Sequence, residues 1–129
     1  MIDTSIFKYI DVLDKAADAS WLKNDALANN IANVDTPGYN RQDVNFEDAL
    51  QSALMKNSYV SLDEKIDNLD WDRLDVGVYT EYTSYSYRLD ENNVDIDTEN
   101  VKLAENQLVY QGLTNSISEE LNRLKSVCT

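Results

Sequence analysis

Residues 4–37 decide the fold, and they read TSIFKYIDVLDKAADASWLKNDALANNIANVDTP. Apolar or small side chains recur along this stretch at alternating steps of four and three residues, the spacing of one face of a helix. These positions are Ile6, Ile10, Leu13, Ala17, Ser20, Asn24, Leu27, Ile31 and Val34. Pro37 disfavours helical geometry at Thr36. The stretch therefore predicts one helix that is capped at Thr4 or Ser5, ends near Asn33 and is about 43 Å long.

A second stripe runs through the last third of the chain. Its apolar positions are Leu103, Tyr110, Leu113, Ile117, Leu121 and Leu124. Asp97-Thr98-Glu99 supplies a cap and an acidic first turn, which suits the positive end of a helix, so we expect a helix from Thr98 to about Val127. Gly112 costs roughly 1 kcal/mol against Ala inside a helix, which predicts that a neighbour approaches closely there.

Two long helices cannot cover all of each other's apolar surface, which favours packing between subunits over a closed monomeric bundle. Each stripe also contains polar positions, which are Ser20 and Asn24 in the first and Gln107 and Thr114 in the second. Such positions are typical of helix seams in which polar residues determine the register and the choice of partner. The predicted assembly interface contains Ile6, Ile10, Leu13, Leu27, Ile31, Val34, Leu103, Tyr110, Leu113, Ile117, Leu121 and Leu124.

The middle of the chain has a different character. Pro37-Gly38 predicts a type II turn, and 46–55 predicts a short amphipathic helix. Residues 57–75 are acidic without a clear period and are expected to be mobile, whereas 76–89 is β-prone. The fold class is therefore mainly α: a helix in 1–35, a middle segment in 36–97 and a helix in 98–129. The two helices form a coiled-coil-like pair, one assembly domain.

Composition excludes several functions. The 129 residues include 11 Lys or Arg and 24 Asp or Glu, a net charge of −13, which argues against nucleic acid and against anionic membranes. No apolar run is long enough to insert into a membrane, and the start of the chain lacks a cleavable signal. The chain has no His and one Cys, Cys128. We therefore expect no enzymatic activity, no cofactor and no metal.

The acidic runs do not match known sites. Calcium loops started at Asp90, Asn93 or Asp95 all fail at the required Gly and Glu positions, so a turn followed by a helix cap is preferred. Carboxylates at 67, 70, 72 and 75 are interpreted as a solvated stretch and not as a catalytic pair.

Two segments of the sequence resemble one family. Residues 28–39, ANNIANVDTPGY, closely resemble the N-terminal signature of bacterial flagellar rod and hook proteins. Residues 87–100, YRLDENNVDIDTEN, and the following 103–111 are similar to a rod member, with Glu91 where the family commonly has Gly. The signature residues are Ala28, Asn29, Asn30, Ile31, Ala32, Asn33, Thr36, Pro37, Gly38 and Tyr39.

The resemblance implies a structural subunit of the proximal rod in the flagellar basal body, exported by the flagellar type III apparatus without a cleaved signal. It also implies that terminal helices build a hollow shaft. The implied partners are further copies, the rod protein FlgC, the junction protein FliE and the export apparatus. Phe46 and Leu50 match the family's export-gate pattern, which packing of a small helix explains equally well. The alternatives are another rod component such as FlgC, or an acidic coiled-coil adaptor or export chaperone.

Overall fold

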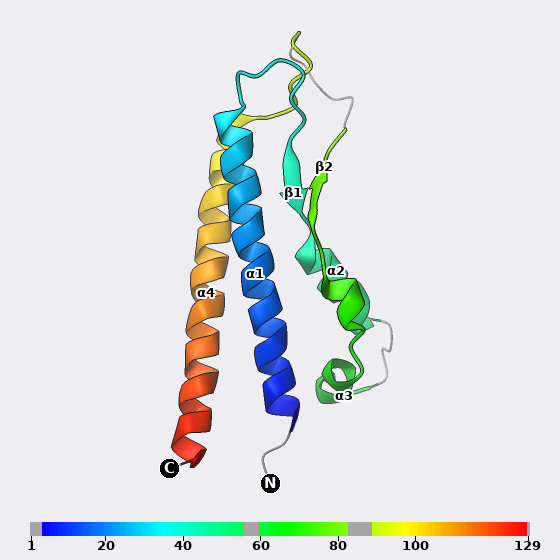
Figure 1. The fold of residues 1–129 in the computed structure, drawn as a ribbon, viewed down its shortest axis with the longest axis vertical. Coiled ribbons are helices and arrows are strands. Elements are labelled where there is room, and N and C mark those ends of the chain that lie inside the picture. The colour runs from blue at the N-terminus through cyan, green and yellow to red at the C-terminus, as the bar shows by residue number, and fades with distance from the viewer. Residues whose placement is uncertain (1–3, 56–59, 83–88, 129) are drawn as a thin grey trace.

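The computed structural model describes residues 4–55, 60–82 and 89–128. Two long helices, α1 (Thr4–Ala32) and α4 (Ile96–Cys128), lie side by side and run in opposite directions (Figure 1). The middle segment packs along the other side of α1. It contains β1 (Gln42–Val44), α2 (Phe46–Met55), α3 (Leu62–Asp67), the 3-10 helix η1 (Trp71–Leu74) and β2 (Val78–Thr80). The prediction of a mainly α chain with long terminal helices is confirmed.

The end of α1 follows the predicted local signals. The helix has 29 residues and stops at Ala32, one residue before the predicted end. The amide of Tyr39 then donates to the carbonyl of Thr36 at 3.3 Å, and Gly38 has φ +71°. The type II turn at Pro37-Gly38 is therefore confirmed, because that turn requires positive φ at its third residue.

The start of α4 corrects the prediction. The helix begins at Ile96, two residues earlier than expected, and the side chain of Asp95 caps it. Asp95 Oδ1 accepts from the amides of Asp97 at 3.1 Å and Thr98 at 3.4 Å. The expected cap at Asp97-Thr98-Glu99 is wrong because these residues already lie in the helix. The predicted acidic first turn is confirmed, since it contains Asp97 and Glu99.

The strands β1 and β2 form a two-stranded antiparallel sheet. Gln42 pairs with Thr80, and Val44 pairs with Val78. The predicted helix over 46–55 is confirmed with the expected bounds. The predicted β-prone stretch yields three strand residues, and 83–88 lie outside the described residues.

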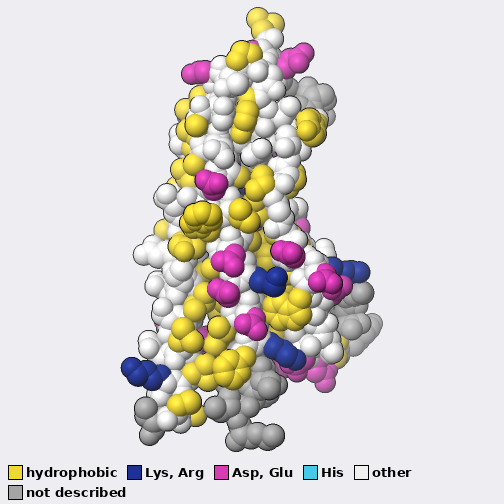
Figure 2. Space-filling model, in the orientation of Figure 1, with side chains coloured by type: hydrophobic (Ala, Val, Ile, Leu, Met, Phe, Trp, Pro, Cys, Tyr) yellow, Lys and Arg dark blue, Asp and Glu magenta, His cyan; other side chains and the backbone are white. Residues whose placement is uncertain are grey.

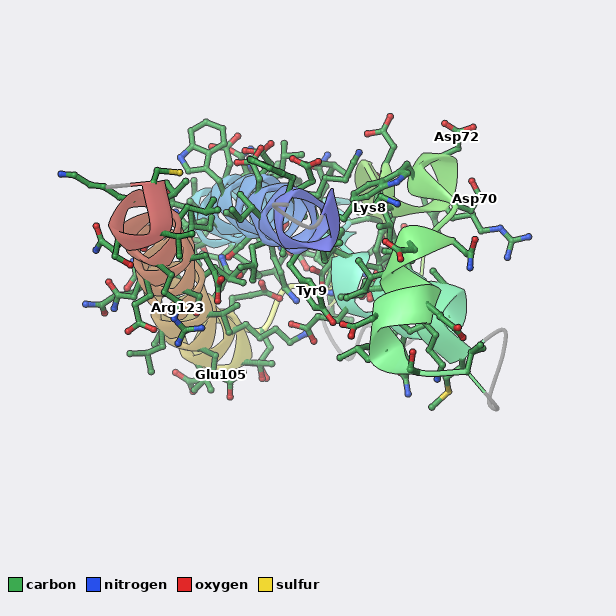
Figure 3. All side chains as sticks on the ribbon, turned by 90° about the horizontal axis from the view of Figure 1, so that it is seen from below. Lys8, Tyr9, Asp70, Asp72, Glu105 and Arg123 are labelled. Carbon is green, nitrogen blue, oxygen red and sulfur yellow. The ribbon has the colours of Figure 1, made fainter. Side chains whose placement is uncertain are left out.

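The acidic stretch 57–75 was expected to be mobile, but its described part contains the helices α3 and η1. Ile66, Leu69 and Leu74 are buried there, in one apolar cluster with Ala19 of α1 and Phe46 of α2. Near the start of α1, Tyr9 donates to Asp63 at 2.6 Å and Lys8 pairs with Asp67 at 3.1 Å. Figure 3 shows Lys8 and Tyr9 on the side of α1 that faces α3. Apolar burial and these contacts give the segment its structure despite its charge.

A turn at Leu89–Asn92 joins the middle segment to the end of α1. The side-chain amide of Asn92 donates to the carbonyls of Asn33, Val34 and Thr36 at 2.9, 3.1 and 2.8 Å. These carbonyls belong to residues that follow Ala32, so the Asn92 side chain holds the chain just beyond the end of α1. In this turn Glu91 has φ +62°, a left-handed conformation that side chains with a Cβ rarely adopt.

Two further observations concern the surroundings of Gly112 and the length of the apolar helices. A Cβ placed on Gly112 would meet no heavy atom within 4 Å, so no part of the described chain makes the close approach predicted there. None of the described helices is both long and apolar enough to cross a membrane.

Replacing Glu91 by Gly should stabilise the chain, because Gly adopts positive φ without the penalty of a Cβ. We expect the free energy of unfolding to rise by about 0.5–1 kcal/mol, the left-handed penalty reduced by the extra freedom of Gly in the unfolded chain. Denaturant titration measures this change. As the matched control, Gly38→Ala at φ +71° should lower the free energy of unfolding by about 1 kcal/mol. A loss of stability in Glu91→Gly would contradict strain at this turn.

Candidate assembly surface

The two terminal helices differ sharply in burial. Of the 33 residues of α4, Glu99 and Asn106 alone are buried in the subunit. Several large apolar side chains of this helix are therefore open to solvent, among them Val101, Leu108 and Val127, which are 57%, 70% and 74% exposed. By contrast, α1 lies between α4 and the middle segment and is covered on two sides. The surface available to neighbours is mainly the outer side of α4 and the remaining face of α1.

The predicted interface residues fall into distinct groups. Leu27 is fully buried within the subunit, so it cannot contact a neighbour in this conformation. Tyr110 and Leu121 are exposed, at 39% and 51%. The side chain of Ile6 lies outside the described residues. The half-buried group contains Ile10, Leu13, Ile31, Val34, Leu103, Leu113, Ile117 and Leu124.

A buried polar pair connects α1 to α4. Ser20 Oγ donates to Asn106 Oδ1 at 3.0 Å, and Asn106 Nδ2 donates to the carbonyl of Ser20 at 2.7 Å. Ser20 was predicted as a polar seam residue of the first helix and Gln107 as one of the second, but Gln107 is exposed and Asn106 takes the seam position. That prediction is wrong by one residue, which is about 100° around a helix. Because the pair is buried, water cannot replace a hydrogen bond that is lost when the helices shift. The pair therefore sets the register of the two helices.

A second polar cluster surrounds Arg41, which is 6% exposed. Its guanidinium contacts Glu99 of α4 at 2.6 Å, Asp43 of β1 at 3.0 Å and Glu81, just after β2, at 2.9 Å. Burial alone would lower the pKa of Arg41, but its hydrogen bonds to Glu99, Glu81 and Asp43 outweigh this and raise the pKa above its ordinary value. The cluster thus keeps a buried charge paired.

Asn30, a signature residue, ties α1 into this cluster and is fully buried. Its amide nitrogen donates to Glu99 at 3.1 Å and to the carbonyl of Gln42 at 2.7 Å. Its amide oxygen accepts from the Gln42 amide at 2.8 Å and from the Tyr39 hydroxyl at 3.0 Å. All four hydrogen-bonding positions of this side chain are therefore used.

The other signature residues have different surroundings. Thr36 donates its hydroxyl to Asn33 Oδ1 at 3.1 Å and so belongs to the end of α1. Pro37 and Gly38 form the exposed turn already described. Ala28, Asn29 and Ala32 are exposed, and Ile31 is half-buried. The signature therefore combines residues that hold the subunit together with residues that its fold leaves at the surface.

Phe46 and Leu50 both pack in the apolar cluster, Phe46 at 8% exposure and Leu50 half-buried. Phe46 is therefore accessible to another protein only when this part of the chain is unfolded. In the described part of the chain, no three metal-binding side chains converge. Asp90 and Asp95 make local contacts of turns and caps, and Asn92 also bonds to the segment that follows α1.

The sequence did not identify Arg41, Glu99, Asn92 or Asn106 as structural residues. Their contacts join distant positions, and the Arg41–Glu99 hydrogen bond spans 58 residues of sequence. One local signal was available, because Arg41 is the only Lys or Arg between 24 and 55. A lone cation between acidic residues is a candidate for a buried ion pair.

The sequence also matches known proteins. Residues 15–40 match the family model described as flagella basal body rod protein. The chain is 35% identical to the flagellar basal body rod protein FlgB of Bacillus subtilis over 121 residues, 93% of this chain and 92% of that protein. FlgB of Borrelia hermsii is 36% identical over 82% of this chain and 84% of its own length. FlgB of Escherichia coli K12 is 29% identical over 81% of each.

An elongated helix pair with an exposed outer side, together with these matches, defines a structural subunit of the flagellar basal body rod. Within that class, the chain belongs to the FlgB family.

Changing Glu99 to Gln should destabilise the subunit, because Arg41 loses its shortest charged contact and keeps Asp43 and Glu81. We expect the free energy of unfolding to fall by about 1.5–3 kcal/mol, the usual range for a hydrogen bond to a charged group. Thermal or denaturant unfolding measures it. The control is Glu105→Gln on the exposed side of α4, which should stay within about 0.5 kcal/mol of the parent chain. Equal effects of the two changes would show that the buried cluster contributes no special stability.

Proposed function

We propose that this chain polymerises in the proximal rod through the outer faces of its terminal helices, as part of a hollow shaft. The observation that carries the proposal is the exposure of α4: a helix of 33 residues that its own subunit buries at two positions only. Large apolar side chains left in water favour association, since covering them releases free energy of about 25 cal/mol per Å². A contact between different faces of successive subunits builds an open filament, which is the form that a rod requires.

The proposed division of labour follows the three sequence segments. Residues 1–35 and 98–129 form the assembly domain, and 36–97 form a side unit that braces α1. Packing of the apolar cluster against α1 supports this division. Because the brace covers one side of α1 only, it leaves the outer side of α4 for neighbouring subunits.

The proposed partners are further copies of this chain, FlgC, FliE and the flagellar type III export apparatus. Membership in the rod family supports assembly with other basal-body components. The proposed location is the proximal rod on the periplasmic side, reached without a cleaved signal. The role is proposed to be structural and not catalytic, without membrane insertion. Binding to nucleic acid is not proposed, because a net charge of −13 would repel the phosphate backbone. The relatives reported above all carry the FlgB name, which favours this member over FlgC.

Replacing Leu108 by Asp tests whether the outer side of α4 is an interface. Leu108 is 70% exposed, so the charge stays in water in the free subunit and the fold should tolerate it. In an assembled rod the same charge would be buried without a partner, and we expect loss of motility and loss of the chain from purified basal bodies. Circular dichroism of the purified variant and immunoblots of basal bodies measure the two effects.

Leu27→Asp serves as the contrasting variant. Leu27 is fully buried inside the subunit, so this change should unfold the chain before any assembly step. Normal swimming with Leu108→Asp would remove the outer side of α4 from the assembly surface.

The residues Phe46 and Leu50 are the proposed contact with the export gate. Replacing Phe46 by Ala should then lower the amount of chain that leaves the cytoplasm, measured in a strain that cannot complete the rod. Phe46 is also buried in the apolar cluster, and its truncation should cost roughly 3–5 kcal/mol of stability.

Leu74→Ala separates the two roles, because Leu74 is buried in the same cluster and lies outside the export pattern. Reduced export of Phe46→Ala alone supports the gate contact. Equal export of Phe46→Ala and Leu74→Ala, whether normal or reduced, leaves packing as the only role of Phe46.

A further inference from the structure

A groove of about 480 Å³ runs between α1 and α4. Its apolar part includes Trp21 of α1 and Tyr110 and Ile117 of α4, and Asp14 and Asp18 also line it. Trp21 is 60% exposed, although a large aromatic side chain gains free energy on burial. Exposed Trp and Tyr side chains are enriched in surfaces that bind another protein.

The charged residues that line this groove determine which kind of segment it can bind. None of the described residues that line it is Lys or Arg. On α1 the exposed carboxylates Asp11, Asp14, Asp18 and Asp25 follow helical spacing on one face. Figure 2 shows magenta Asp and Glu side chains over α1, along the middle of the view, with dark-blue Lys or Arg side chains beside them. A segment rich in carboxylates would be repelled here, so the groove suits an apolar anchor accompanied by cations.

The chain itself carries such a segment at the end of α4. Residues 121–128 contain Arg123 and Lys125 and no Asp or Glu, in a chain with a net charge of −13. Leu121 and Val127 in the same segment are 51% and 74% exposed. Arg123 pairs with Glu120 at 3.1 Å, but its side chain is 72% exposed, and surface pairs of this kind contribute little to stability. Arg123 can therefore leave Glu120 and pair with a carboxylate of the groove at little cost in free energy.

Two other cations of the described residues lie in unsuitable surroundings. Arg73 pairs with Asp70 at 3.2 Å, and Asp72 precedes it in the sequence. Figure 3 labels both carboxylates. Lys8 pairs with Asp67 at 3.1 Å. Both positions belong to acidic surfaces that the groove would repel.

We propose that the groove binds the segment 121–128 of a second copy of this chain, with Arg123 facing Asp14 and Asp18 and Lys125 adding to the positive charge of the same segment. The proposal deepens the proposed function, on which it rests, by assigning the two faces that meet. The contact is heterologous, because one copy contributes the groove and the other the end of α4.

The position of the two faces has a geometric consequence. The groove contacts α4 at 110–117, whereas the bound segment is centred near residue 124 of the same helix. The two lie roughly ten residues apart, so a parallel neighbour is displaced by about 15 Å along the helix axis. A rotation combined with such a displacement does not close into a flat ring and continues as a helical assembly.

A charge exchange tests the pairing. The groove variant carries Asp14→Lys and Asp18→Lys, the tail variant carries Arg123→Glu and Lys125→Glu, and the third variant combines all four changes. Each of the first two opposes like charges, so we expect incorporation into purified basal bodies to fall by at least about tenfold. The combined variant restores opposite charges and should return to within about threefold of the parent chain.

The matched control, Asp72→Lys with Asp75→Lys, makes the same change in net charge as the groove variant, on exposed side chains of the middle segment that do not line the groove. It should leave incorporation unchanged. Circular dichroism of each purified variant checks that α1 and α4 remain folded.

The outcomes separate this inference from the function on which it rests. If the parent chain is absent from basal bodies, the proposed function fails and the inference fails with it. If the parent is present but the combined variant stays as poor as its two components, the pairing is overturned. A defect in the groove variant with a normal tail variant would mean that a different cationic partner occupies the groove. Normal incorporation of the groove variant would leave the groove without an occupant.

Discussion

The buried guanidinium of Arg41 is the interaction on which the rest of this structure depends. It contacts Glu99 in the first turns of α4, Asp43 in β1 and Glu81 beside β2, so one side chain joins the last helix to both strands. A buried charge is tolerated only when it is paired, and the three carboxylates can meet it in one arrangement of these elements. Asn30 extends the arrangement to α1 by bonding to Glu99 and to the backbone of Gln42. Polar contacts at one end of the helix pair thereby set the relative position of α1, α4 and the strands.

The same arrangement explains why the subunit is suited to a rod. Its stabilising contacts lie on the inner sides: the Arg41 cluster, the Ser20–Asn106 pair and the apolar cluster between α1 and the middle segment. The outer side of α4 contributes almost nothing to the fold, although it carries Val101, Leu108 and Val127 in water. Register is therefore set inside one subunit by polar residues, and the apolar surface outside it remains for association with neighbours. A subunit with a carboxylate-rich α1 face and a basic end of α4 also has different faces to offer to successive neighbours.

The sequence predicts the parts of this fold that local patterns control. The seam from Ile10 to Val34 and the ring of Pro37 define α1 and its end, and Gly38 supplies the positive φ of the turn. Alternating acidic residues made the start of α4 ambiguous, and Asp95 proved to be the cap in place of Asp97. The elements α3 and η1 were missed because Ile66, Leu69 and Leu74 are too few and too irregularly spaced to show a period. Leu27 was assigned to the subunit interface because an apolar stripe has the same spacing whether a helix packs inside or between chains. The Arg41 cluster has no period at all, since its partners meet only in the folded chain.

Thiol labelling of the free and the assembled chain tests the central claim most directly: the inner seam is used within one subunit, and the outer side of α4 is used between subunits. Single cysteines would be placed at Ala17, which is 8% exposed, and at Leu108, which is 70% exposed, after the exposed Cys128 is changed to Ser. The rate of alkylation is then measured on the purified chain and on intact basal bodies. The account predicts that position 17 reacts slowly in both, and that position 108 reacts at least about tenfold more slowly after assembly, because a close-packed interface excludes the reagent. Unchanged reactivity at 108 in basal bodies, or rapid labelling at 17 in the free subunit, would contradict it.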